Sequence, residues 1–145
     1  MRAAVLQGSK ITIETLADPR PGPGQLLVSP LFTGICGSDL HFRARAIGAE
    51  AETPADQRHV LPQIVPGHEF SAIVEEIGPE TDTSLRPGDR IAGLPFTHCA
   101  TGFEVIGLSA TRSGGLSTLC LVDAERAFQV PDDVPSELAA LTEPL

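Results

Sequence analysis

The chain has 145 residues, of which 41% are hydrophobic, and its formal net charge is −9 at pH 7. This length suffices for one domain with a buried core, and no apolar run approaches the ~20 residues of a membrane span. A strongly acidic chain with a single lysine disfavours nucleic acid and anionic membrane surfaces as partners. Three scattered cysteines and no secretory h-region argue against a disulfide framework, so a cytoplasmic protein is expected.

The N-terminal part of the chain is predicted to be β-structure. Residues 3–7 and 11–14 are expected to form two short strands joined by a Gly8-Ser9 turn, because polar and apolar residues alternate in the second of them. Residues 18–24 hold three prolines and two glycines, which is typical of a connector. A buried strand is predicted to begin at Leu26.

A dense group of reactive side chains follows this strand. Cys36, Ser38, Asp39 and His41 fall within six residues, where a strand-to-helix corner is predicted. In a helical turn, Ser38 and His41 share one face, while Cys36 and Asp39 share the neighbouring face. One face can then hold a metal while the other passes protons. From this stretch alone, a solvated turn with an ordinary buried cysteine remains an equal alternative.

Residues 43–62 show little pattern and are predicted to form an exposed loop with a helical turn at most. His59 lies in this segment and is expected on the surface rather than at a metal. Long loops in compact domains are often functional, so this one can overhang a substrate pocket.

The rest of the chain indicates a mainly β fold. Residues 69–77 form the longest predicted strand, with Phe70, Ala72, Val74 and Glu76 on one face and Ser71, Ile73, Glu75 and Ile77 on the other. Further strands are expected at residues 91–94 and, as a pair, at 116–122 and 127–130. Short strands separated by Gly and Pro predict a barrel-like sandwich with short helices.

The C-terminal residues predict a helix. Ser136 is a natural N-cap, and Leu138, Leu141 and Leu145 recur at helical spacing. Because the helix is still apolar where the sequence stops, the chain is expected to be a piece of a longer protein.

Three motifs occur in the order found in one enzyme family. They are C-x-[ST]-D-x-H from Cys36 to His41, G-H-E from Gly67 to Glu69, and P-G-D from Pro87 to Asp89. Together they resemble the catalytic domain of the zinc-dependent medium-chain alcohol and polyol dehydrogenases. The resemblance covers nearly all of residues 1–145 and implies a single GroES-like domain. No G-x-G-x-x-G follows any predicted strand, so the Rossmann domain of the family is expected outside these residues.

The resemblance also implies the site and its cofactors. Cys36 and His68 match zinc ligands, and the third ligand is either Glu69 or Glu143. Ser38 matches the group that accepts the proton of the substrate hydroxyl, and His41 the group that passes it to solvent. The implied activity is the oxidation of a polyol, sugar or secondary alcohol with NAD or NADP, which this domain alone does not bind. The small-molecule alcohol is the expected partner, with a homo-oligomer in the full-length form.

The sequence departs from the family pattern at two further places. Ala72 stands where the G-H-E motif usually continues to a glycine, and residues 96–119 hold only Cys99 where many relatives have four cysteines for a structural zinc. Cys99 and Cys120 are therefore expected to be small buried residues.

Three other functions remain as alternatives. A non-enzymatic GroES-like interaction module has no need of the complete ligand set, and a zinc-free quinone reductase relative lacks the cysteine and histidine ligands. A metallohydrolase with Glu69 as its base leaves the pair Ser38 and His41 without a role.

Overall fold

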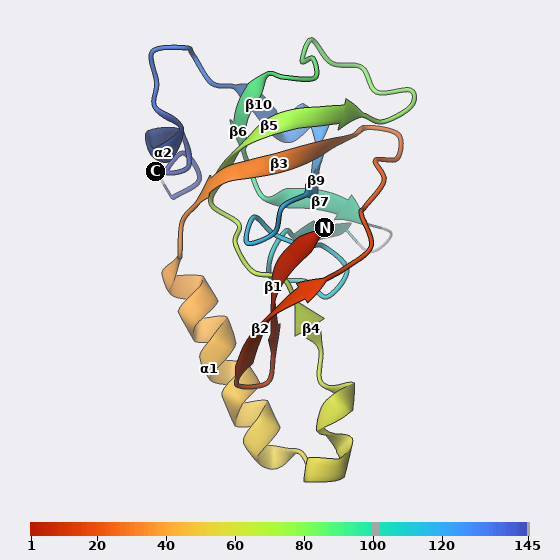
Figure 1. Cartoon of the computed structure of the whole chain (residues 1–145), viewed down its shortest axis with the longest axis vertical. Coiled ribbons are helices and arrows are strands. Elements are labelled where there is room, and N and C mark those ends of the chain that lie inside the picture. Colours follow the sequence, from red (N-terminus) through yellow and green to blue (C-terminus); the bar gives the residue numbers. More distant parts are fainter. Residues whose placement is uncertain (100–101, 145) are drawn as a thin grey trace.

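The computed structural model describes residues 1–99 and 102–144 of the chain, which fold mainly into β-strands (Figure 1). The elements are, in chain order, β1 (Arg2–Gln7), β2 (Lys10–Thr15), β3 (Gln25–Thr33), α1 (Gly37–Glu52), the 3₁₀ helix η1 (Ala55–Val60), β4 (Gln63–Ile64), β5 (Phe70–Ile77), β6 (Arg90–Gly93), β7 (Phe96–Cys99), β8 (Gly102–Val105), β9 (Cys120–Asp123), the 3₁₀ helix η2 (Ala124–Arg126), β10 (Ala127–Gln129) and α2 (Ser136–Ala139). The mainly β fold class is confirmed. No helix among the described residues is long and apolar enough to cross a membrane.

The largest sheet has five strands in the order β10-β6-β5-β3-β9, and every neighbouring pair in it is antiparallel. A second sheet has the order β2-β1-β4, and β7 and β8 form a hairpin. The main core lies against the five-stranded sheet. Its fully or nearly fully buried side chains include Leu26, Val28, Ala72, Val74, Ile91, Ile106 and Cys120.

The five-stranded sheet must curl into a barrel-like form. Strands β9 and β10 were predicted to pair with each other, but they lie at opposite edges of this sheet, so that prediction is wrong. Only the three residues of η2 join them, and four residue steps span at most about 14 Å. Four strand spacings in a flat sheet measure about 19 Å. The short connection is therefore possible only because the two edges approach each other.

A bulge in β5 changes which side chains reach the core. Leu27 pairs with Glu76 and Val28 with Val74, so Glu75 is an extra residue between two paired positions. Such a residue reverses the alternation of faces beyond it. Ile77 consequently packs on the same core as Val74, and the prediction that the two face opposite ways is wrong.

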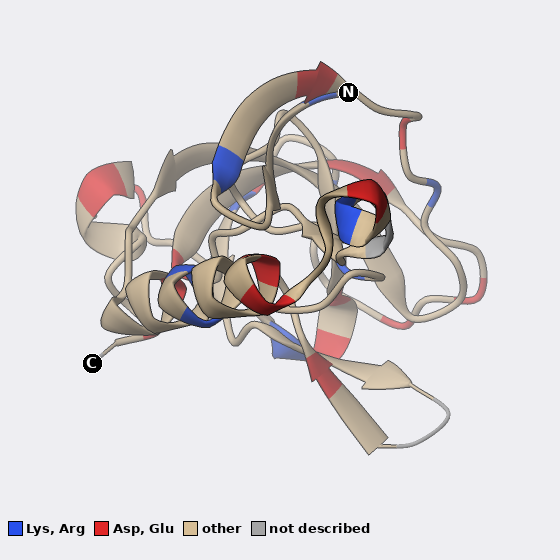
Figure 2. Cartoon of the chain, turned by 90° about the horizontal axis from the view of Figure 1, so that it is seen from below, with Lys and Arg blue, Asp and Glu red and all other residues tan. Residues whose placement is uncertain are grey.

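Residues 43–62, predicted as an exposed loop, include the C-terminal part of the 16-residue helix α1 and then η1. Most of these residues are exposed as expected, including His59, but the loop assignment is wrong. None of the residues of α1 is fully buried, and the helix carries charges of both signs (Figure 2). It therefore lacks the apolar stripe by which helices are recognised, although its many Ala, Arg and Glu residues are good helix formers.

Glu50 ties the end of α1 to the turn between β1 and β2. Its carboxylate accepts a hydrogen bond from the backbone N–H of Ser9 at 2.6 Å and lies 3.7 Å from the guanidinium of Arg58. Hydrogen bonding from Ser9 lowers the pKa of Glu50 from its ordinary value of 4.5. A carboxyl group whose pKa is lower in the folded than in the unfolded state stabilises the fold above its unfolded pKa. This stabilisation is lost as the pH falls through the folded pKa.

We therefore expect Glu50→Gln to lower the free energy of unfolding at neutral pH, with a difference from wild type that shrinks as the pH falls through the pKa of Glu50 in the folded state. Urea unfolding at several pH values measures this difference. Glu52→Gln, which changes an exposed carboxylate on the same helix, is the matched control and should behave as wild type. A Glu50→Gln difference that is constant with pH would contradict the role assigned to its charge.

The C-terminal helix is shorter than predicted. α2 covers Ser136–Ala139 with Pro135 as its N-cap, so the assignment of Ser136 as the cap is wrong. Arg90 donates to the Ser136 hydroxyl at 3.1 Å, which uses that oxygen elsewhere. Leu138 and Leu141 are exposed, and Leu145 lies outside the described residues.

Candidate metal centre

The pairing of β3 with β5 brings the two reactive motifs together. Thr33 at the end of β3 pairs with Phe70 at the start of β5. Cys36 follows β3 within three residues, and His68 and Glu69 directly precede β5. Antiparallel strands place the end of one beside the beginning of the other. Two motifs that are 30 residues apart in the chain therefore meet at one end of the sheet.

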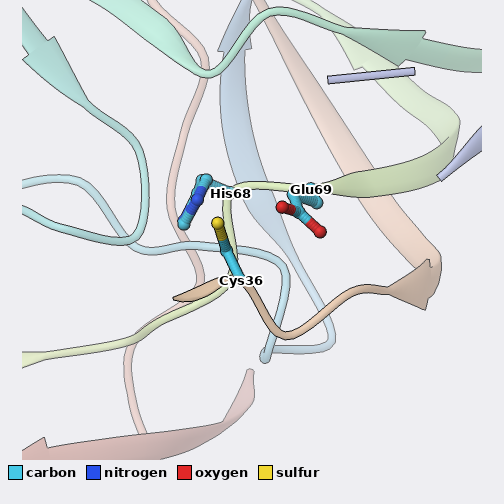
Figure 3. Close-up of side chains that lie close together, drawn as sticks. All are labelled: Cys36, His68 and Glu69. Atoms are coloured by element: carbon cyan, nitrogen blue, oxygen red, sulfur yellow. The ribbon is translucent and has the colours of Figure 1, made fainter. Parts of the chain in front are cut away.

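Three potential metal donors converge at this point. The Cys36 sulfur, a ring nitrogen of His68 and a carboxylate oxygen of Glu69 all lie within 4.8 Å of one another, and Figure 3 shows the three side chains gathered there. His68 and Glu69 are 4% and 6% exposed, and Cys36 is half-buried. Thiolate, imidazole and carboxylate are the donor types that zinc binds in proteins, at about 2.0–2.3 Å. With small side-chain adjustments one zinc ion fits this group.

Asp39 lies against the ring of His68 on the side away from Ser38. Its Oδ1 atom is 3.4 Å from His68 Nδ1, while its Oδ2 atom accepts a hydrogen bond from the backbone N–H of Cys36 at 3.0 Å. Both Asp39 Oδ1 and His68 Nδ1 are buried without a hydrogen-bond partner. A slight approach lets Nδ1–H donate to the carboxylate, which leaves Nε2 unprotonated and able to bind a metal.

Ser38 and His41 lie on α1, as the motif required. The Ser38 hydroxyl is 3.0 Å from His68 Nε2, so it borders the donor group directly. His41 is one helical turn further along and is exposed. This arrangement places the half-buried hydroxyl toward the donors and the imidazole toward solvent. Their parts in proton transfer remain predictions.

Glu143 does not belong to the group of three donors. It is half-buried in the turns that follow α2, and among the described residues the donors within 4.8 Å of one another are Cys36, His68 and Glu69. Of the two carboxylates that the sequence left open, Glu69 therefore lies with the other donors. A role for Glu143 as a ligand remains a prediction.

The two remaining cysteines differ from each other. Cys120 is fully buried, and burial raises the pKa of its thiol to about 12, so it is an inert packing residue as expected. Cys99 ends β7 and is half-buried, which differs from the expectation of a buried residue.

The glycines whose backbone contacts support the turn that precedes His68 were not identified from the sequence. Gly67 has φ +99°, and its carbonyl accepts a hydrogen bond from the backbone N–H of Gly115 at 2.7 Å. Gly114 donates to the carbonyl of Val65 at 2.8 Å, and a Cβ atom on Gly114 would lie 2.2 Å from the Gly67 oxygen. The double glycine Gly114-Gly115 thus permits a backbone-to-backbone contact that no other residue allows.

Comparison with known proteins identifies this architecture. A family model described as the alcohol dehydrogenase GroES-like domain matches residues 22–132. The chain is 35% identical to the (R,R)-butanediol dehydrogenase of Bacillus subtilis (strain 168), over 99% of this chain and 44% of that protein. It is 34% identical to the L-threonine 3-dehydrogenase of Thermococcus kodakarensis, over 88% of this chain and 37% of that protein.

Solved structures agree with these relatives. The crystal structure of 2R,3R-butanediol dehydrogenase from Bacillus subtilis matches with a TM-score of 0.77 at 32% identity, covering 99% of this chain and 44% of that one. A putative zinc-binding dehydrogenase from Sinorhizobium meliloti 1021, bound to NADP, matches with a TM-score of 0.77 at 30% identity, covering 99% and 42%. The GroES-like fold is thereby confirmed, and the chain spans less than half the length of these relatives.

Proposed function

This chain belongs to the family of alcohol dehydrogenase GroES-like domains, and from that premise we propose that it is the zinc-binding catalytic part of an enzyme that oxidises alcohols with NAD or NADP. The observation that carries the proposal is the convergence of Cys36, His68 and Glu69 at one end of the sheet. An oxidoreductase acting on alcohols is also the activity named for the relatives. Polyols, sugars and secondary alcohols are the proposed substrates.

Cys36, His68 and Glu69 would hold the zinc ion, with Glu143 as a further carboxylate that can replace or join Glu69. Three protein donors leave one position for water or substrate, which is the arrangement of catalytic rather than structural zinc sites. When bound, zinc supplies a Lewis acid that stabilises negative charge on the oxygen of the alcohol. Asp39 holds the ring of His68 so that one nitrogen faces the metal.

Ser38 and His41 would move the proton of the reaction. Ser38 accepts the proton of the substrate hydroxyl and His41 releases it to solvent, as general acid–base catalysis requires. A nicotinamide cofactor, when bound, would accept a hydride from the carbon that bears this hydroxyl, so that the alcohol becomes a carbonyl compound. The sequence holds no glycine-rich turn for a pyrophosphate, so we assign dinucleotide binding and oligomerisation to other parts of the enzyme.

The metal content of the chain tests the proposal. We expect about one zinc per chain after purification with added zinc, measured by elemental analysis, because the residues that the structure describes include one group of three donors. A content near zero would favour the alternative of a GroES-like interaction module without catalysis. A content near two would show that residues 96–119 still hold a structural metal despite having only Cys99.

A further inference from the structure

Gly34 occupies the short link between β3 and Cys36. Its backbone N–H donates to the carbonyl of Glu69 at 2.7 Å and so extends the pairing of β3 with β5 by one bond. Its φ does not lie in the left-handed region, unlike that of Gly67 in the facing turn. The backbone conformation alone therefore does not require glycine at this position.

The side chain of Glu69 fills the space beside Gly34. A Cβ atom built on Gly34 would lie 2.4 Å from Glu69 Oε2, 3.2 Å from its Cβ and 3.5 Å from its Cδ. These three nearest atoms all belong to that one side chain, and 2.4 Å is far inside van der Waals contact. The buried carboxylate can keep its observed place next to Cys36 and His68 only while residue 34 has no side chain.

We propose that Gly34 is a positioning residue whose missing side chain admits the Glu69 carboxylate to the metal donors Cys36 and His68. This inference rests on the proposed function, since it assumes that the donor group binds a metal. With glycine at position 34, the donor group contains Cys36, His68 and Glu69. With a side chain there, it would contain only Cys36 and His68 and would need a carboxylate from another part of the protein. A single methyl group at residue 34 pushes the Glu69 carboxylate out of the group without removing it from the protein.

The experiment compares Gly34→Ala with the same substitution at a glycine where an added Cβ atom contacts no other atom. Gly37 lies three residues further on, and a Cβ atom on it has no neighbour within 4 Å, so Gly37→Ala is the matched control. Zinc dissociation constants of the 145-residue chain are measured by competition with a chromophoric chelator. The visible absorption of the cobalt(II)-substituted chain reports the number and type of donors. Glu69→Ala and the double variant Gly34→Ala/Glu69→Ala complete the set.

We expect Gly34→Ala and Glu69→Ala to weaken zinc binding by similar factors, both at least as large as the loss of about 10–100-fold that follows when a residue supporting a ligand is changed. Both should alter the cobalt spectrum in the same way, while Gly37→Ala matches wild type. The double variant should bind zinc no more weakly than Glu69→Ala, because the two changes remove the same donor.

Two results would overturn the inference while the proposed function stands. One is wild-type zinc affinity in Gly34→Ala. The other is a double variant that binds zinc more weakly than Glu69→Ala, which would show that Gly34 does not act through Glu69. The second comparison remains decisive even if Gly34→Ala does not fold, because Glu69→Ala removes Oε2, the atom nearest to the new methyl group, together with Cδ. Absence of zinc binding by the wild-type chain itself would overturn both the inference and the proposed function.

Discussion

Replacing Cys36 with alanine is expected to remove the metal and, with it, alcohol oxidation in the complete dehydrogenase. Cys36 supplies the sulfur of the donor group and lies within 4.8 Å of the donor atoms of His68 and Glu69. Changing a residue that only supports a ligand weakens metal binding by about 10–100-fold, so loss of a ligand itself should exceed that factor. His68→Ala should have the same effect. Zinc content and turnover are measured on the same preparation, and both should fall below detection.

Cys120→Ala separates loss of the metal from general damage to the fold. It also removes a thiol, but Cys120 is fully buried in the core and its thiol pKa is about 12. Its cost should appear as a loss of about 0.5–3 kcal/mol in unfolding free energy, with zinc content and turnover retained. If Cys36→Ala kept one zinc per chain, the metal would have to use donors outside the group of Cys36, His68 and Glu69.

The donors could be predicted from the sequence because most of their arrangement is local. Cys36, Ser38 and Asp39 fall within one turn of the chain, and His68 and Glu69 are neighbours, so spacing alone sets which side chains can act together. Their meeting across 30 residues was not local. It depends on the register of Thr33 with Phe70, and in this case the family resemblance rather than any pattern in the residues anticipated it.

What the sequence did not predict depends on contacts between distant segments. The bulge at Glu75 arises where β5 meets β3, and no feature of residues 69–77 alone marks it. The separation of β9 from β10 depends on which strands occupy the two edges of the curled sheet. Most of helix α1 was not predicted because it makes few contacts with the core. None of its residues is fully buried, so the sequence shows no apolar stripe at helical spacing.

The two candidate carboxylates for the third ligand position also show that contacts between distant segments were not predicted from the sequence. Glu69 and Glu143 were both candidates by residue type and motif, although only Glu69 follows His68 directly in the chain. The structure places Glu69 with Cys36 and His68 because the link from β3 to α1 runs beside β5 and has no side chain at Gly34. The place of Glu69 therefore depends on its contact with a distant backbone, and a role for Glu143 as a ligand remains a prediction.

Ser38→Ala is expected to slow turnover by about 10²–10⁴-fold, the usual contribution of a positioned acid–base group, while the zinc stays bound. The Ser38 hydroxyl lies 3.0 Å from His68 Nε2, which puts it beside the donors, yet it is not one of them. Under the proposed roles, its removal takes away the proton acceptor for the substrate hydroxyl and leaves Cys36, His68 and Glu69 in place. Turnover, zinc content and the pH dependence of the rate are measured together.

Ser38→Thr is the matched variant for this prediction, since it keeps the hydroxyl and adds only a methyl group. We expect it to recover most of the turnover that Ser38→Ala loses, because the proton acceptor is restored. If Ser38→Ala instead released the zinc, the hydroxyl would be supporting His68 rather than accepting a proton. If Ser38→Ala left turnover unchanged, the proton would have to reach solvent by a route that does not include Ser38, and the exposed His41 would then have no partner through which to act.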